Sequence, residues 1–167
     1  LEHEFYLKAL HKTASMSLMQ YEVSNFAKAD FQSRSNLKVW DGQPYLGLGC
    51  GAHSFDGVNR WGNVRSMRKY MESVGREEPP RDFMETPTRL QQASERLMLS
   101  LRRPEGLNIL SWQEEFQIGL SLEQKNQMEK LKDQDLVSWE SPILKLTTEG
   151  MLLADAITAE LMPDIQH

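Results

Sequence analysis

Two short stretches decide which fold this chain can adopt: Tyr-Glu-Val-Ser-Asn-Phe-Ala-Lys at residues 21–28 and Tyr-Leu-Gly-Leu-Gly-Cys-Gly-Ala-His-Ser at residues 45–54. Each has the composition of a strand that ends in small or polar residues, and a polar loop joins them. Polar side chains and bare glycine backbone at strand ends are where a barrel-type enzyme builds its site. We therefore expect these two stretches to form part of a ligand-binding rim.

The residues around these stretches suggest a βα arrangement. Residues 2–13 follow a loosely helical pattern, and residues 17–24 then switch to strand chemistry. A helix that leads into a strand is half of a βα unit. Residues 29–43 are a polar loop with a helical turn at 36–40, and residues 45–49 form the second expected strand. Because no earlier strand precedes this pattern, we expect a fragment of a larger repeat.

A hairpin, a short helix and a domain boundary are expected next. Asp56-Gly57 is a strong tight-turn signal and predicts a hairpin within residues 55–64. Residues 66–74 predict a helix that Gly75 ends. The charged, proline-containing segment that follows is the best candidate boundary. We therefore expect two domains, residues 1–78 and residues 79–167.

The second half predicts several helices. Thr86-Pro87 has the pattern of an N-cap followed by a first-turn proline, and the residues after it place apolar side chains on one helical face. Residues 111–114 and 121–124 both fit the capping-box pattern, in which a Ser and a Glu or Gln satisfy each other's backbone donors. These signals predict three helices.

The end of the chain predicts a hairpin and a last helix. Residues 136–139 and 143–146 are short apolar runs separated by Glu-Ser-Pro, which predicts a hairpin. Thr147 or Thr148 then begins a helix that runs to about Leu161. Three helices, a hairpin and a closing helix predict a winged-helix-like module. The fold class is therefore expected to be α+β.

Composition restricts the classes of function. The chain has 167 residues, long enough to bury about 70% of its unfolded surface. Its formal charge of −5 argues against binding to a nucleic-acid backbone, and residues 108–161 carry ten acidic residues against four lysines. No apolar run approaches a membrane span, and the first residues lack signal-peptide character. With Cys50 as its single cysteine, the chain is expected in the cytoplasm.

The candidate site residues lie at the ends of the two expected strands. His53 follows three alternating glycines, where its imidazole, with the backbone of Gly51 and Ala52, would reach the mouth of a site. A hydrogen-bonded structural role for His53 is the alternative. Glu22 and Asn25 end the first strand and either contact a ligand or brace the next loop. No zinc site is predicted, because the histidines lack partners at metal-ligand spacing.

Arginines and aromatic side chains near this region have two interpretations as well. Arg60 is part of a local basic group that could pair with ligand carboxylates, and for Arg68 and Lys69 a solvated helix face is the favoured interpretation. The other members of that group are Arg65, Arg68 and Lys69. Trp40 and Trp61 either stack on a flat ligand such as a tetrapyrrole or pack in the core.

These motifs, taken in order, resemble those of the radical S-adenosylmethionine family of oxygen-independent coproporphyrinogen III oxidases, and particularly its haem-chaperone branch. That family commonly shows Tyr-Glu-Ile/Val-Ser-Asn-Phe/Tyr-Ala, Ser-Arg-His-Asn, Tyr-Trp and Gly-Ala-His-Ser. The matching positions here are 21–27, 33–36, 40 and 51–54. Segments of the second half are also similar to the family's C-terminal domain: 95–101, 105–107 and 146–150. Two departures occur, because Ser35 replaces the motif histidine and Cys50 replaces a common proline.

The resemblance implies a fold and a set of cofactors. Residues up to about 75 would be the last part of an open radical-SAM (β/α) barrel, and the rest an appended helical domain. In the family, three cysteines in a Cys-x3-Cys-x2-Cys motif hold a [4Fe-4S] cluster that reduces S-adenosylmethionine. Cys50 alone cannot supply three thiolates, so the cluster-binding part of the barrel is expected outside this chain. The position of His53 lies beside a second bound S-adenosylmethionine in the oxidase branch.

Three hypotheses about function follow. The first is a C-terminal fragment of a coproporphyrinogen-oxidase-like radical SAM protein, whose intact parent decarboxylates porphyrinogen propionates or delivers haem. It implies a porphyrin or haem ligand and the absent N-terminal half of the barrel as partners, and His53-Ser54 favours the chaperone branch. The second is a non-catalytic haem-binding or interaction module. The third, a winged-helix nucleic-acid binder, is disfavoured by charge, and a homo-oligomer is left open.

Overall fold

A computed structural model describes residues 2–162 and contains helices and short strands in three antiparallel sheets. In chain order, the first elements are α1 (Glu2–Ala14), β1 (Met19–Glu22), β2 (Asn25–Ala27), α2 (Arg34–Trp40), β3 (His53–Phe55), β4 (Arg60–Asn63), α3 (Met67–Gly75) and β5 (Arg81–Glu85). The remaining elements are α4 (Arg89–Leu101), β6 (Leu107–Asn108), α5 (Ile109–Phe116), α6 (Leu122–Asp133), β7 (Val137–Glu140), β8 (Ile143–Leu146), α7 (Thr148–Leu152) and α8 (Ala154–Leu161).

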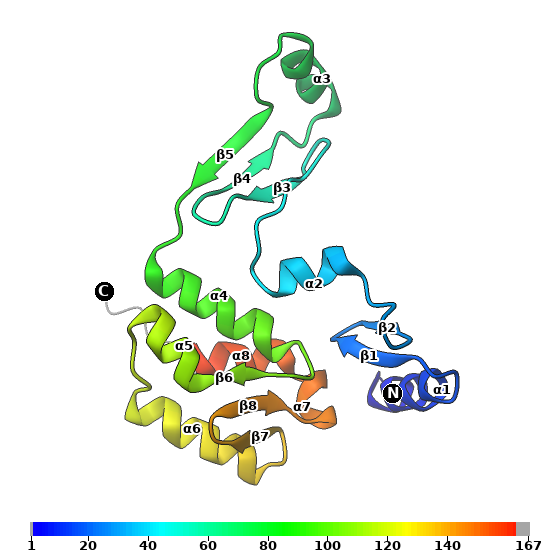
Figure 1. The fold of residues 1–167 in the computed structure, drawn as a ribbon, viewed down its shortest axis with the longest axis vertical. Coiled ribbons are helices and arrows are strands. Elements are labelled where there is room, and N and C mark those ends of the chain that lie inside the picture. Colours follow the sequence, from blue (N-terminus) through cyan, green and yellow to red (C-terminus); the bar gives the residue numbers. More distant parts are fainter. Residues whose placement is uncertain (1, 163–167) are drawn as a thin grey trace.

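Figure 1 shows three parts. The β3–β4–β5 sheet and α3 extend away from a body formed by α4 to α8, and we call this extension the arm. The short β1–β2 sheet and α1 lie beside the body, and α2 lies between them and the arm. The arm and the body are joined along the chain by the segments that follow α2 and β5.

The largest hydrophobic core lies in the body. Its buried members all come from residue 93 or later, and they are spaced along α4 so that Ala93, Leu97 and Leu101 share one face. Trp112 of α5 packs against this face and donates its indole N–H to the carbonyl of Ala93 at 3.0 Å. The indole therefore brings its one polar group into the core with a partner.

The body has winged-helix topology. After α4 and the short strand β6 come α5 and α6, and the β7–β8 hairpin then completes a sheet of order β6-β8-β7. A Cβ on Gly150 would lie 1.8 Å from the carbonyl oxygen of Leu136, so α7 approaches the start of the hairpin as closely as only glycine allows. The predicted hairpin and winged-helix-like module are confirmed.

Most predicted helices are present, with two corrections at their starts. Ser121 and Gln124 form the predicted capping box of α6. The helix predicted after Thr86 begins later, because Thr88 accepts the amide hydrogen of Gln91 and forms a capping box with it. Residue 88 therefore is the N-cap, and the proline lies outside α4.

The second correction concerns α5. The side chain of Asn108 accepts the backbone N–H of Ser111 at 3.0 Å, so Asn108 is the N-cap and Ser111 lies inside the helix. The capping box predicted at residues 111–114 is therefore wrong. The last predicted helix is also divided, because α7 ends at Leu152 and α8 begins at Ala154.

The helix at the N-terminus and the hairpin in the arm are where the sequence predicts them. The α1 helix covers residues 2–14, and β3 and β4 form the hairpin around the Asp56-Gly57 turn. The next strand, β5, pairs with β4 in the register Trp61↔Met84. The arm's sheet thus includes residues on both sides of position 78.

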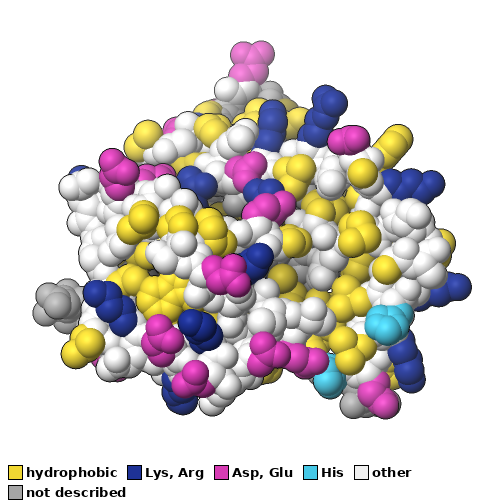
Figure 2. All heavy atoms as spheres, turned by 60° about the horizontal axis from the view of Figure 1, so that its bottom comes forward, with side chains coloured by type: hydrophobic (Ala, Val, Ile, Leu, Met, Phe, Trp, Pro, Cys, Tyr) yellow, Lys and Arg dark blue, Asp and Glu magenta, His cyan; other side chains and the backbone are white. Residues whose placement is uncertain are grey.

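The surface of the body mixes charges of both signs. Figure 2 shows Lys and Arg side chains interspersed with Asp and Glu on the face that carries the bottom of Figure 1, with small hydrophobic areas between them. No extended basic field is seen on that face. Among the helices of residues 2–162, none combines the length and apolar character that crossing a membrane requires.

Candidate functional site

The second predicted strand is a loop. Only Tyr45 forms a bridge, to Phe55, and residues 46–52 leave the strand conformation. The reason lies in the glycines, because Gly49 has φ of 105° and Gly51 has φ of 70°, values that a strand does not use. We call residues 46–52 the glycine loop.

Side chains of the arm hold the glycine loop by hydrogen bonds to its backbone. The amide of Gly47 donates to the hydroxyl of Ser54 at 2.9 Å, and the side-chain amide of Asn63 donates to the carbonyl of Gly49 at 2.9 Å. The amide of Gly49 donates to the Tyr70 hydroxyl at 3.2 Å. Ser54 is fully buried and Asn63 nearly so, which makes these bonds insensitive to competition from water.

A Cβ on Gly47 would lie 2.1 Å from the carbonyl oxygen of His53, so the loop packs directly against β3. The loop presents apolar side chains outward in spite of these bonds: Leu46 is 70% exposed and Leu48 is 82% exposed. A backbone held in this way keeps both leucines in solvent instead of letting them fold onto the sheet.

His53 lies on an exposed face of the arm's sheet. Its ring contacts Phe83 edge to face, with the centroids 5.5 Å apart and an interplanar angle of 61°. The register His53↔Gly62↔Phe83 places Gly62 between them, and a Cβ there would lie 2.5 Å from a Phe83 ring carbon. Glycine thus leaves space for the two rings to meet. The imidazole is therefore accessible to a ligand, as a hydrogen-bonding or a coordinating group.

Glu22 and Asn25 pair with each other across the tight β1–β2 connection. The Glu22 side chain is only 1% exposed and accepts the backbone N–H of Ser24 at 3.2 Å, so it braces the turn. Asn25 is exposed. The predicted site residues therefore form two groups: Glu22 with Asn25, and residues 51–53. Figure 1 shows that their two sheets lie apart.

The loop between these groups connects them through α2. Ser33 caps α2, and the Asn36 side chain donates to the hydroxyl of Tyr21 at 3.3 Å. Tyr21 is buried in β1. Asn36 is a position of the family motif, and here it fixes α2 to β1.

The basic residues near the site are partly engaged within the chain. Arg60 pairs with Glu85 of its own sheet and with Glu95 of α4. Burial lowers the pKa of Arg60, but the bonds to both carboxylates outweigh this effect and raise it above its ordinary value. Arg68 pairs with Glu72 one turn along α3, and both side chains are exposed. This agrees with a solvated helix face.

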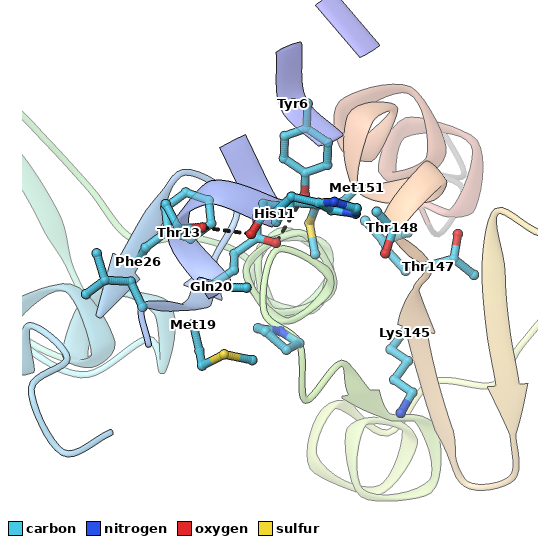
Figure 3. Close-up of a pocket in the computed structure, with 15 residues that line it drawn as sticks. Tyr6, His11, Thr13, Met19, Gln20, Phe26, Lys145, Thr147, Thr148 and Met151 are labelled. Carbon is cyan, nitrogen blue, oxygen red and sulfur yellow. Dashed lines mark hydrogen bonds between the residues drawn. The ribbon is translucent and has the colours of Figure 1, made fainter. Parts of the chain in front are cut away.

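Sequence reasoning did not identify a cavity of about 690 Å³ between the N-terminal elements and the body. Figure 3 shows Tyr6, His11 and Gln20 on one wall and Lys145 and the two threonines at the start of α7 on the other. The lining residues come from positions 6–26 and 104–151, and no sequence pattern relates segments this far apart. None of the predicted site residues lines the cavity.

The residues present do not fit an iron–sulfur cluster. Such a cluster takes cysteine thiolates, and Cys50, the single cysteine, is exposed on the glycine loop. Within residues 2–162, His, Cys, Asp and Glu form no group that could hold a metal ion.

Comparison with known proteins shows which proteins the chain is similar to. No protein-family model matches it. It is 29% identical over 165 residues to "Heme chaperone HemW" of Bacillus subtilis. The matched region covers 98% of this chain and 43% of that protein. The protein of the same name from Mycobacterium tuberculosis is 31% identical over 142 residues, covering 85% and 34%. "Radical S-adenosyl methionine domain-containing protein 1, mitochondrial" of Mus musculus is 27% identical, covering 100% and 40%.

A solved structure supports the fold. The chain superimposes with a TM-score of 0.74 and 16% identity on coproporphyrinogen III oxidase (HemN) from Escherichia coli, described as a radical SAM enzyme, covering 93% of this chain and 39% of that one. The superposition confirms the α+β fold class, and the similarity to the relatives named above confirms the family resemblance. The chain spans 34% to 43% of the length of the three relatives.

Proposed function

We propose, from the relationship to the radical SAM heme chaperones, that this chain forms the part of such a protein that completes the barrel and carries the winged-helix-like module. The observation that supports this most directly is a similarity that extends over 98% of the chain to a protein named as a heme chaperone. The intact parent would transfer haem or decarboxylate porphyrinogen propionates. Its S-adenosylmethionine and [4Fe-4S] cluster would be held by residues outside this chain.

In this proposal His53 contacts the ligand from the arm. The accessible imidazole, the adjacent aromatic ring of Phe83 and the fixed glycine loop support this role, because a ligand then meets groups that are already in place. Gly51 and Ala52 would offer backbone groups beside it. Glu22, being buried, would act on the ligand through the turn that carries Asn25.

Haemin titration tests the proposal on the chain itself. We expect a shift of the Soret band relative to free haemin, and we expect the substitution His53→Gln to weaken binding at least tenfold. His3→Gln is the matched control, because His3 lies on α1 and its glutamine can still bond Glu149. Equal binding by the two variants would remove His53 from the site, and an unshifted Soret band would remove the haem ligand.

The second candidate function is a haem-binding or interaction module without catalysis. The observation that favours it is the single exposed cysteine, which leaves the chain without the thiolates of a cluster. Haemin binding by this chain, together with an intact parent that does not decarboxylate coproporphyrinogen, would support it. Decarboxylation by the parent would favour the oxidase instead.

Location and domain organisation are parts of the same proposal. We place the parent in the cytoplasm, where a single unpaired cysteine stays reduced. We place the domain border near residue 78, with residues 79–167 as the helical domain. The core supports a separate C-terminal domain, because its buried members begin at Ala93. Residues 81–85 nevertheless pair with β4 of the arm, so the β4–β5 ladder crosses the proposed border.

A further inference from the structure

The cavity shown in Figure 3 has two walls of different origin. One wall comes from α1, β1 and β2, and the other from β8, α7 and Pro104 in the turn after α4. A volume of about 690 Å³ lies within the range of small-molecule sites, roughly 300 to 1,000 Å³. Its size thus suits one organic molecule.

The cavity is lined mainly by apolar side chains. Hydrophobic residues from both walls contribute: Leu10, Ala14, Leu18, Met19, Phe26, Leu146 and Met151. The hydroxyl of Tyr6 and the side-chain amide of Gln20 also line it, but they bond each other and the backbone of Val23. Those two polar groups are therefore satisfied without a ligand, and an apolar molecular body fits the space.

The charged groups of the lining have one sign. Lys145 and His11 are the ionisable bases there, and among the described residues no Asp or Glu contributes to the lining. Within residues 2–162, neither base forms an ion pair. The acidic neighbour on α7, Glu149, pairs with His3. In a chain with a formal charge of −5, such a lining is a local preference for an anion.

We propose that this cavity binds a small amphipathic carboxylate, with its apolar body between the two walls and its carboxylate at Lys145. Thr148 lines the same wall and adds a hydroxyl to the lining, whereas the Thr147 hydroxyl is already engaged: it accepts the Gly150 amide and donates to the Asp135 carbonyl. This inference does not depend on the proposed function. A porphyrin with propionates and a long-chain fatty acid share this chemistry.

Fluorescence titration with protoporphyrin IX, its dimethyl ester and a fluorescent fatty acid tests the proposal on the full chain. We expect a carboxylate ligand to bind and Lys145→Gln to weaken it about fivefold, the effect of one partly exposed ion pair. Lys125→Gln is the control, because Lys125 is exposed on α6 and away from the cavity. The dimethyl ester should bind more weakly than the free acid.

A second pair of variants tests the cavity without disturbing the core. Met19 lines it and is 64% exposed, and Met67 on α3 is 70% exposed and does not line it. Met19→Asp should weaken binding more than tenfold, whereas Met67→Asp should leave it unchanged. Absence of binding by both acids, or equal effects within either pair of variants, would overturn the proposal. Fatty-acid binding alone would support the cavity and place haem recognition elsewhere.

Discussion

The guanidinium of Arg103 pairs with the carboxylate of Asp41, which joins the end of α2 to the segment that follows α4. Arg96 of α4 contacts the same residue, donating from Nη1 to the Asp41 carbonyl at 2.9 Å. Two arginines thus hold the one turn that connects the N-terminal elements to the arm. The carboxylate contact can be removed by itself, because the carbonyl contact is to the backbone.

Asp41→Asn should therefore destabilise the chain by about 1 kcal/mol, because the largely buried Arg103 loses one of its two carboxylate partners and keeps only Glu105. Urea unfolding followed by circular dichroism measures this. Asp155→Asn is the control: Asp155 pairs with Arg102, but its side chain is 89% exposed. It should change the unfolding free energy by less than about 0.5 kcal/mol. The two arginines are buried to a similar extent, so equal effects would show that exposure of the carboxylate is not what matters.

Gly150→Ala should be strongly destabilising, by about 3 kcal/mol or more, because the new Cβ would clash with the Leu136 carbonyl. The clash is with backbone, so it cannot be relieved by a rotamer change. Gly75→Ala is the matched control, because Gly75 also lies in a helix and has nothing within 4 Å of its Cβ position. It should stabilise by about 0.5–1 kcal/mol. Thermal unfolding of both variants decides between these expectations.

Ser54→Ala should loosen the glycine loop. The Gly47 amide would lose its acceptor at 2.9 Å in a buried place, at a cost of about 1–2 kcal/mol. Hydrogen exchange at the Gly47 amide should become faster, while exchange in α4 stays unchanged. Unchanged protection of Gly47 would show that its hydrogen bond to Ser54 does not limit opening of the loop.

The turn of the arm's hairpin should weaken in acid. Backbone N–H groups of Asn59 and Val58 donate to the Asp56 carboxylate and hold its pKa below the ordinary value of 3.8. The folded state therefore binds the proton less well than the unfolded state. The contribution of Asp56 to stability is present above pH 3.8 and is lost as the pH falls through the lowered pKa. A carboxyl titration by NMR that gives a normal or raised pKa would contradict this.

The helices and hairpins of this chain could be predicted because their signals are local. The capping box at Ser121 and the turn at Asp56-Gly57 each lie within four residues, and both are present. Where two nearby residues could each cap a helix, the sequence alone did not predict which one is the N-cap. Thr88 and Asn108, like Thr86 and Ser111, carry a side-chain oxygen that can cap a helix, and packing of the apolar helix face selects the start.

The features that sequence reasoning missed depend on contacts between distant residues. Alternating glycines look like a strand pattern, yet positive φ at Gly49 and Gly51 makes residues 46–52 a loop that Ser54 and Asn63 hold from β3 and β4. The direction of the Glu22 side chain and the cavity at Lys145 likewise follow from packing. Neither has a periodic signal along the chain.

The two ion pairs of Arg60 affect how the arm is attached to the body. Glu85 belongs to the arm and Glu95 to the body, so a single guanidinium fastens one to the other. Its side chain is 34% exposed, and ions in solution compete for it. The orientation of the arm relative to the body should consequently depend on ionic strength. It should vary less in dilute buffer and more in concentrated salt, while both parts stay folded.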